Sequence, residues 1–177
     1  MNEAIRNLMT RRSVRAFATE KNISREDLQT IVDAARMAPS AMNRQTWTFV
    51  VVQNQEKIQK LAAAVGKAMG RAEGYNFYLP NAVVICANDM NANPMGVQDC
   101  ACAMQNIFLA ANALGIGSVW INQLLDTCND PEVRALLTDL GLPAEKNAIA
   151  MAALGYAATE VPMREKKPEE ETVVWTF

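Results

Sequence analysis

The sequence predicts a single domain, residues 1–177, in which α-helices and β-strands alternate. Two observations predict it. At 177 residues, 50% of them hydrophobic, the chain is long enough to bury one core and too short for two domains of ordinary size. Segments with apolar residues at helical spacing also alternate with short apolar runs that are rich in β-branched and aromatic residues.

In the first half of the chain, helix and strand patterns enclose one polar loop. Ser24 begins a sequence that approximates a capping box, and Pro39 ends the helix that follows. The strand after the loop is aromatic and β-branched, which is typical of β-structure. In order, the sequence predicts a helix over 2–10, a helix over 24–38, an irregular loop over 38–45, a strand over 47–52 and a helix over 55–69.

The second half contains a strand and a helix that are apolar on all sides. The continuous apolar run 82–87 predicts a strand buried on both faces. The longest helix, expected over 93–114, must be covered all round, either as a central core helix or by a second subunit. Further elements are expected over 117–121 (strand), 130–140 (helix) and 148–155 (strand), and the charged tail ends in a strand-like run, 172–177, that we expect to dock on the body or on a partner.

Composition excludes several classes of function. The formal net charge is -2 with a pI near 5.3, so no basic field is available for nucleic acid or a membrane surface. The chain has no histidine, and its four cysteines form no C-x-x-C pair, which argues against Ser-His-Asp chemistry and against a bound metal. Without a leader-like or membrane-spanning run, we expect a cytoplasmic protein that acts on a small molecule and borrows its reactivity from an organic cofactor.

A basic segment follows the first helix. Arg11, Arg12, Ser13 and Arg15 offer three guanidinium groups and a hydroxyl within five residues. Such a set suits charge-assisted, multidentate binding of a phosphate monoester. The alternative is a solvated basic turn at a helix end. Neither the G-x-G-x-x-G pattern nor a P-loop is present, so a phosphate here would not be held by a glycine-rich cradle.

A second polar cluster lies in the loop before the first strand. Ser40, Asn43 and Gln45 present uncharged donors and acceptors close to Trp47. Such groups suit the edge of a neutral heterocycle, although Ser and Asn are also common in loops because they form turns.

Four segments stand in a fixed order along the chain: 11–17 (RRSVRAF), 38–47 (APSAMNRQTW), 106–121 with its GIGSVWI ending, and 154–156 (LGY). In this order and spacing they resemble the nitroreductase family, and the resemblance covers nearly the whole chain. It implies an α+β fold with a central, mostly antiparallel or mixed sheet flanked by helices. It also implies an intertwined homodimer with FMN bound at each interface.

The resemblance also implies which residues bind the cofactor. It assigns the basic segment to the FMN phosphate and flavin edge, and the loop cluster to the FMN of the other subunit. The segment expected beside the reactive flavin nitrogen comprises Trp120, Ile121, Asn122 and Gln123. The basic residues that could complete the phosphate site are Arg164, Lys166 and Lys167.

The implied reaction is ping-pong transfer of electrons from NADH or NADPH through FMN to an acceptor such as a nitroaromatic, a quinone or an enone, with no side chain as obligatory acid or base. The alternatives are a flavin-binding sensor or storage dimer, and reductive dehalogenation or flavin breakdown on the same fold. The sequence departs from the family pattern at Thr46 and Ala157, where proline is common. It also lacks the insertions that often form a substrate lid.

Overall fold

Four strands form one antiparallel sheet in the computed structural model, which describes residues 1–71 and 73–176. The spatial order is β1-β2-β4-β3, and every neighbouring pair is antiparallel. This confirms the expected α+β class. The strands are β1 (Trp47–Val52), β2 (Ala82–Asn88), β3 (Gly117–Ile121) and β4 (Asn147–Gly155).

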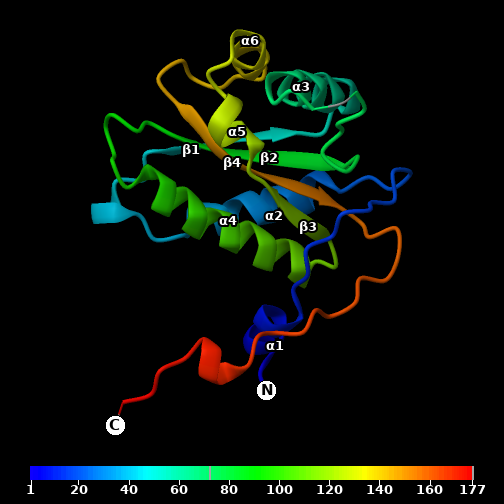
Figure 1. The fold of residues 1–177 in the computed structure, drawn as a ribbon, viewed down its shortest axis with the longest axis vertical. Helices are drawn as coiled ribbons and strands as arrows, with labels where there is room; N and C mark the ends of the chain where they lie inside the picture. The colour runs from blue at the N-terminus through cyan, green and yellow to red at the C-terminus, as the bar shows by residue number, and fades with distance from the viewer. Residues whose placement is uncertain (72, 177) are drawn as a thin grey trace.

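Helices cover both faces of the sheet (Figure 1). On one face lie α2 (Arg25–Arg36) and α4 (Gly96–Ala113), and on the other lie α3 (Gln55–Ala68), α5 (Gln123–Thr127) and α6 (Pro131–Asp139). The first helix, α1 (Glu3–Thr10), lies outside both layers. It is held at the end of α4, where Asn112 Nδ2 donates to Asn7 Oδ1 at 2.6 Å. Within residues 1–71 and 73–176, no helix is long and apolar enough to cross a membrane.

The two central strands supply most of the sheet's buried surface. Every residue of β2 is buried, as the continuous apolar run predicted. Val83 and Ile85 belong to the core cluster on the α3 side, and Val84 belongs to the cluster on the α4 side. This alternation is the period-two pattern of a strand with two covered faces.

The basic segment is attached to the free edge of the sheet. Ser13 forms a parallel bridge with Ser118 of β3, and the Val14 amide donates to the Ser118 carbonyl at 3.0 Å. Gly117 permits this approach, because a Cβ at that position would lie 2.6 Å from Val14 Cγ2. The position of Arg11 to Arg15 therefore depends on close packing against β3.

The expected strand at the C-terminus was wrong for the residues that the structure describes. Residues 172–176 form no strand; one 3-10 turn, η2 (Glu169–Glu171), precedes an extended end, and Phe177 lies outside the described residues. The arm leads away from the body (Figure 1), and Val174 is 91% exposed. A strand needs a neighbouring strand to accept its hydrogen bonds, and an apolar pattern alone cannot supply one.

The longest helix differs from its prediction in two respects. It begins at Gly96 rather than at Asn93, because the Asn93 side chain accepts from the Met95 amide and forms a turn instead. One of its faces is not covered by the chain: Cys102 is exposed, and Val97 is 40% exposed. The short helix α5 was not predicted at all.

We predict that Gly117→Ala destabilises the protein, because the new Cβ would overlap Val14. Overpacking of this kind costs about 1–3 kcal/mol. Urea denaturation followed by circular dichroism measures the change in the free energy of unfolding. Combined with Val14→Ala, which removes Cγ2, the nearest of the overlapping atoms, the substitution should cost less than the sum of the two single variants; strict additivity would contradict the proposed packing.

Candidate functional site

A basic pocket forms where the C-terminal arm leaves the body. Its volume is about 320 Å³. It unites the basic segment near the N-terminus with cations about 150 residues later in the chain. None of the described residues that line it is acidic. The lining residues are Leu8, Met9, Arg11, Arg12, Ser13, Arg15, Val161, Pro162, Met163, Arg164 and Lys166.

The guanidinium groups at this pocket are arranged by uncharged neighbours. Arg11 lies over the ring of Phe108 with its Cζ 5.9 Å from the ring centroid. Arg12 donates to the Met9 carbonyl at 3.1 Å and to the Arg11 carbonyl at 3.0 Å. In the described part of the chain, no carboxylate forms an ion pair with Arg11, Arg12 or Arg15. Their positive charge is therefore available to an anion from outside the chain.

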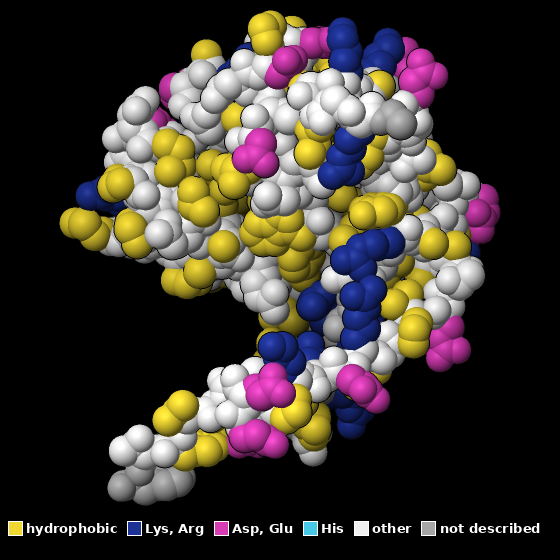
Figure 2. All heavy atoms as spheres, viewed as in Figure 1, with side chains coloured by type: hydrophobic (Ala, Val, Ile, Leu, Met, Phe, Trp, Pro, Cys, Tyr) yellow, Lys and Arg dark blue, Asp and Glu magenta, His cyan; other side chains and the backbone are white. Residues whose placement is uncertain are grey.

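The space-filling view shows the same concentration of charge. In Figure 2, Lys and Arg side chains gather at the inner end of the hollow between the body and the C-terminal arm. Lys167 does not line the pocket, and its Nζ lies 3.6 Å from Glu171 Oε2. Of the three cations expected from the tail, the structure thus brings Arg164 and Lys166 to the basic segment and directs Lys167 to a carboxylate.

The second expected cluster lies on a loop with an unusual backbone. Met42, Asn43 and Gln45 have φ values of 54°, 55° and 49°, in the left-handed region. The loop, which includes the 3-10 turn η1 (Ala41–Asn43), is closed by its own polar groups. Ser40 Oγ accepts from the Gln45 amide at 3.1 Å, and Gln45 Nε2 donates to Asn43 Oδ1 at 2.8 Å.

Within a single chain, this loop and the basic pocket lie apart. The Ala41 amide donates to Asp99 Oδ1 at 2.9 Å, which places the loop at the beginning of α4. The basic pocket is at the other end, where Arg11 contacts Phe108. Figure 1 shows the two regions on opposite sides of the molecule, with α4 extending between them.

The segment 120–123 lies close to the basic pocket. The rings of Trp120 and Phe108 are 6.1 Å apart between centroids, so Phe108 contacts both this segment and Arg11. Ile121 is only 1% exposed, so its side chain belongs to the core. Asn122 Oδ1 accepts from Trp120 Nε1 at 3.2 Å, and Gln123 Oε1 is buried without a hydrogen-bond partner.

Phe108 and Asp99 were not predicted as site residues. Phe108 lies in the apolar pattern of a helix, which gives no indication that one ring supports both an arginine and a tryptophan. Asp99 is a single carboxylate in that helix, and no local sequence pattern connects it to a loop 58 residues earlier.

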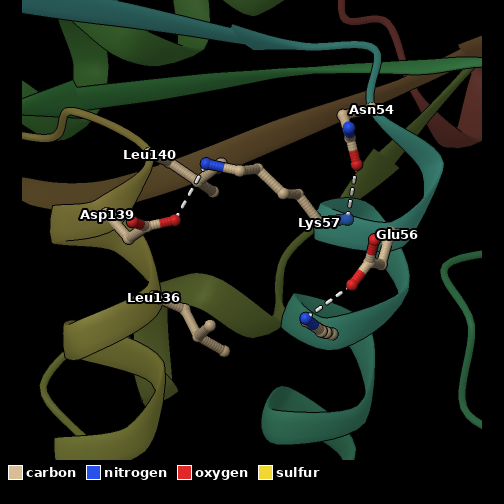
Figure 3. Close-up of a pocket in the computed structure, with 7 residues that line it drawn as sticks. Asn54, Glu56, Lys57, Leu136, Asp139 and Leu140 are labelled. Atoms are coloured by element: carbon tan, nitrogen blue, oxygen red, sulfur yellow. Dashed lines mark hydrogen bonds and ion pairs between the residues drawn. The ribbon is translucent and has the colours of Figure 1, made fainter.

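A smaller pocket between α3 and α6 is not a candidate site (Figure 3). Its volume is about 200 Å³. Lys57 donates to Asp139 at 2.9 Å, and Lys60 pairs with Glu56 at 2.7 Å. The hydrogen bond from Lys57 lowers the pKa of Asp139. Since the charges of its described lining residues satisfy one another, this pocket offers no free charge to a ligand.

An antiparallel sheet between two helical layers defines an α+β protein. The pocket at one edge of this sheet is cationic and has no acidic residue in its described lining, which suits an anionic ligand. Residues 8–156 match the Nitroreductase family. The chain belongs to that family, which confirms the resemblance seen in the sequence. The matched residues contain the basic segment, the loop cluster and the segment 120–123.

Two solved structures and one sequence relative support the same family. A nitroreductase from Bacteroides fragilis, solved with bound FMN, is 39% identical, with 99% of this chain and 100% of that chain covered and a TM-score of 0.92. A nitroreductase from Desulfitobacterium hafniense, also with bound FMN, is 29% identical over 99% of both chains with a TM-score of 0.87. An NADH dehydrogenase/NAD(P)H nitroreductase of Archaeoglobus fulgidus is 38% identical over 166 residues, 90% of this chain and 88% of its own.

Proposed function

We propose that the protein is an FMN-dependent oxidoreductase that takes electrons from NADH or NADPH and reduces small electron-poor molecules such as nitroaromatics, quinones or enones. The observation that carries the proposal is the basic pocket, in which cations from both ends of the chain converge and no described lining residue is acidic. Membership of the Nitroreductase family and the bound FMN of two relatives support FMN as the occupant.

The donors at the pocket fit the phosphate of FMN. A phosphate monoester carries close to two negative charges and accepts several hydrogen bonds, and guanidinium groups bind it in a forked geometry. We assign Arg11, Arg12, Ser13 and Arg15 to this phosphate and the adjacent flavin edge. Arg164 and Lys166 complete the site from the tail, whereas the ion pair of Lys167 with Glu171 makes Lys167 the weakest of the tail candidates.

The segment 120–123 is assigned to the flavin ring. When bound, FMN supplies a two-electron carrier for a ping-pong reaction, in which the nicotinamide donor leaves before the acceptor enters. The main chain of Ile121 to Gln123 would stabilise negative charge on the ring with fixed donors. Trp120, which is 37% exposed, can shield one side of the ring from water.

We infer that the site is shared between two copies of the chain. The loop with Ser40, Asn43 and Gln45 lies away from the basic pocket of its own chain (Figure 1), which supports its assignment to the FMN of another copy. The uncovered face of α4 with Cys102 and Val97 gives a second copy an apolar surface to bury. Three buried free cysteines, Cys86, Cys100 and Cys128, suit the reducing cytoplasm in which we place the enzyme.

Purified protein should show a flavin absorption spectrum that bleaches rapidly and anaerobically when NADH or NADPH is added, because the cofactor accepts electrons from the nicotinamide. An air-free titration with each donor measures this. Slow bleaching by both donors would favour a flavin-binding sensor over an enzyme. Protein that acquires no flavin spectrum after incubation with FMN would refute the proposed cofactor.

Arg11→Ala should weaken FMN binding by about 1.5–3 kcal/mol, the usual value for a hydrogen bond to a charged group. Fluorescence titration of apoprotein with FMN gives the dissociation constant. The matched control is Arg25→Ala, which removes an exposed arginine of α2 that does not line the pocket. Unchanged affinity in the Arg11 variant, or an equal loss in both variants, would remove Arg11 from the site.

Two defective variants should complement each other if the site is shared. One variant combines Arg11→Ala with Arg15→Ala, and the other combines Asn43→Ala with Gln45→Ala. After the two are unfolded and refolded together, random pairing gives mixed dimers with one intact site, about a quarter of all sites. Flavin occupancy that stays at the level of the separate variants would show that both clusters serve the same chain's site.

A further inference from the structure

Asp99 is a buried carboxylate that binds a loop rather than a cation. It lies in the first turn of α4 and is 4% exposed. Its Oδ1 accepts from the Ala41 amide at 2.9 Å, and its Oδ2 accepts from Asn93 Nδ2 at 2.7 Å. None of the ion pairs within residues 1–71 and 73–176 includes it. A buried carboxylate is costly unless hydrogen bonds compensate it, so these two donors offset the burial of Asp99.

Asn93 extends this contact to the far end of the same loop. Its Nδ2 also donates to Thr46 Oγ1 at 2.9 Å, and its Oδ1 accepts from the Met95 amide at 3.1 Å. Asn93 is fully buried, and every hydrogen-bonding group of its amide is used. Asp99 and Asn93 thus hold both ends of the loop, at Ala41 and at Thr46, against the beginning of α4. We call these four residues the loop clamp.

The loop needs such a clamp because its backbone is strained. Left-handed φ values cost most side chains about 1–2 kcal/mol per residue, and asparagine less. Met42 and Gln45 adopt them without the help of glycine. Strained conformations persist only where the surrounding structure determines them. The bonds inside the loop, from Ser40 to Gln45, close it but do not attach it to the rest of the chain.

We propose that Asp99, with Asn93 and Thr46, is a positioning residue for the flavin site: it holds Asn43 and Gln45 in the orientation in which they reach the cofactor. The inference rests on the proposed function, since it assigns those two amides to FMN. Asp99 itself contacts no cofactor. Thr46 takes part through its side-chain hydroxyl, which accepts from Asn93 Nδ2.

The competing explanation is that Asp99 only stabilises the start of α4 through the helix dipole. The matched control is Asp130, the N-cap of α6, whose Oδ1 accepts from two amides at the start of that helix. Asp130→Asn and Asp99→Asn remove the same charge from the start of a helix. Only Asp99 is attached to the loop.

The test compares FMN dissociation constants of the full-length variants with their thermal midpoints. In Asp99→Asn, the new side-chain amide can accept only one of the two hydrogen bonds that Asp99 accepts. In one orientation its NH2 group faces the Ala41 amide, and in the other it faces Asn93 Nδ2, so two donors oppose each other in either case. We therefore expect FMN binding to be about tenfold weaker. Asp130→Asn should lower the midpoint and leave FMN affinity unchanged. Where Asp99→Asn fails to fold, Thr46→Val provides the test, with an expected loss of about threefold and recovery in Thr46→Ser.

A charge exchange gives the sharpest result. In the double variant Asn93→Asp with Asp99→Asn, the amide introduced at position 99 can donate to the carboxylate introduced at position 93 and accept from Ala41. The Thr46 hydroxyl can turn and donate to the same carboxylate. Recovery of most of the lost affinity supports the clamp. Affinity within about twofold of wild type in Asp99→Asn, or an equal loss in Asp130→Asn, overturns it. Wild-type protein that binds no FMN overturns the proposed function and the inference together.

Discussion

Burial of β2 and β4 on both faces is the constraint on which the rest of the structure depends. All residues of β2, and all but the first of β4, are buried. Two covered faces require two helical layers, and these layers account for α2 to α6. The inner positions of the sheet are thereby closed to ligands. Binding groups can collect only at its edges and ends, and the basic segment does so by bridging from Ser13 to Ser118 at the β3 edge.

The same constraint explains which parts of the fold were predictable from the sequence. The run 82–87 is apolar without interruption, so its burial and its start followed from local pattern, whereas the strand continues one residue further, to the buried Asn88. The end of the chain was not predictable in this way, because residues 172–176 have strand-like composition but no neighbouring strand. The start of α4 was misplaced because Asn93 Oδ1 accepts from the Met95 amide in a turn, while Asn93 Nδ2 donates to Thr46 Oγ1 on a distant loop. Local pattern thus failed where a distant partner decides the structure.

The candidate site also combines features that local sequence predicts with features that distant contacts decide. The basic segment and the polar loop were each recognisable, because their residue types are concentrated in short stretches. Their separation in space was not predictable. No local sequence pattern indicates that the polar loop lies at the beginning of α4 and the basic segment near its end. Phe108, which supports both Arg11 and Trp120, was equally hidden. Residues that orient other residues leave only a weak trace in a sequence, because their role is defined by contacts across long chain separations.

Separation of the two clusters by α4 also gives this helix a mechanical role. It is buried against the sheet through residues such as Met104 and Ile107, which are fully covered, and it leaves the face with Cys102 open. A rigid helix with the loop assigned to the flavin fixed at one end and the proposed phosphate pocket at the other would keep the two proposed half-sites at a constant distance. If two copies packed through the open face of α4, the polar loop of one copy would meet the basic pocket of the other without a change in either backbone. Under the proposed shared site, the contacts of Asp99 would order the strained loop before a second chain or a ligand reaches it, which would reduce the ordering cost of binding.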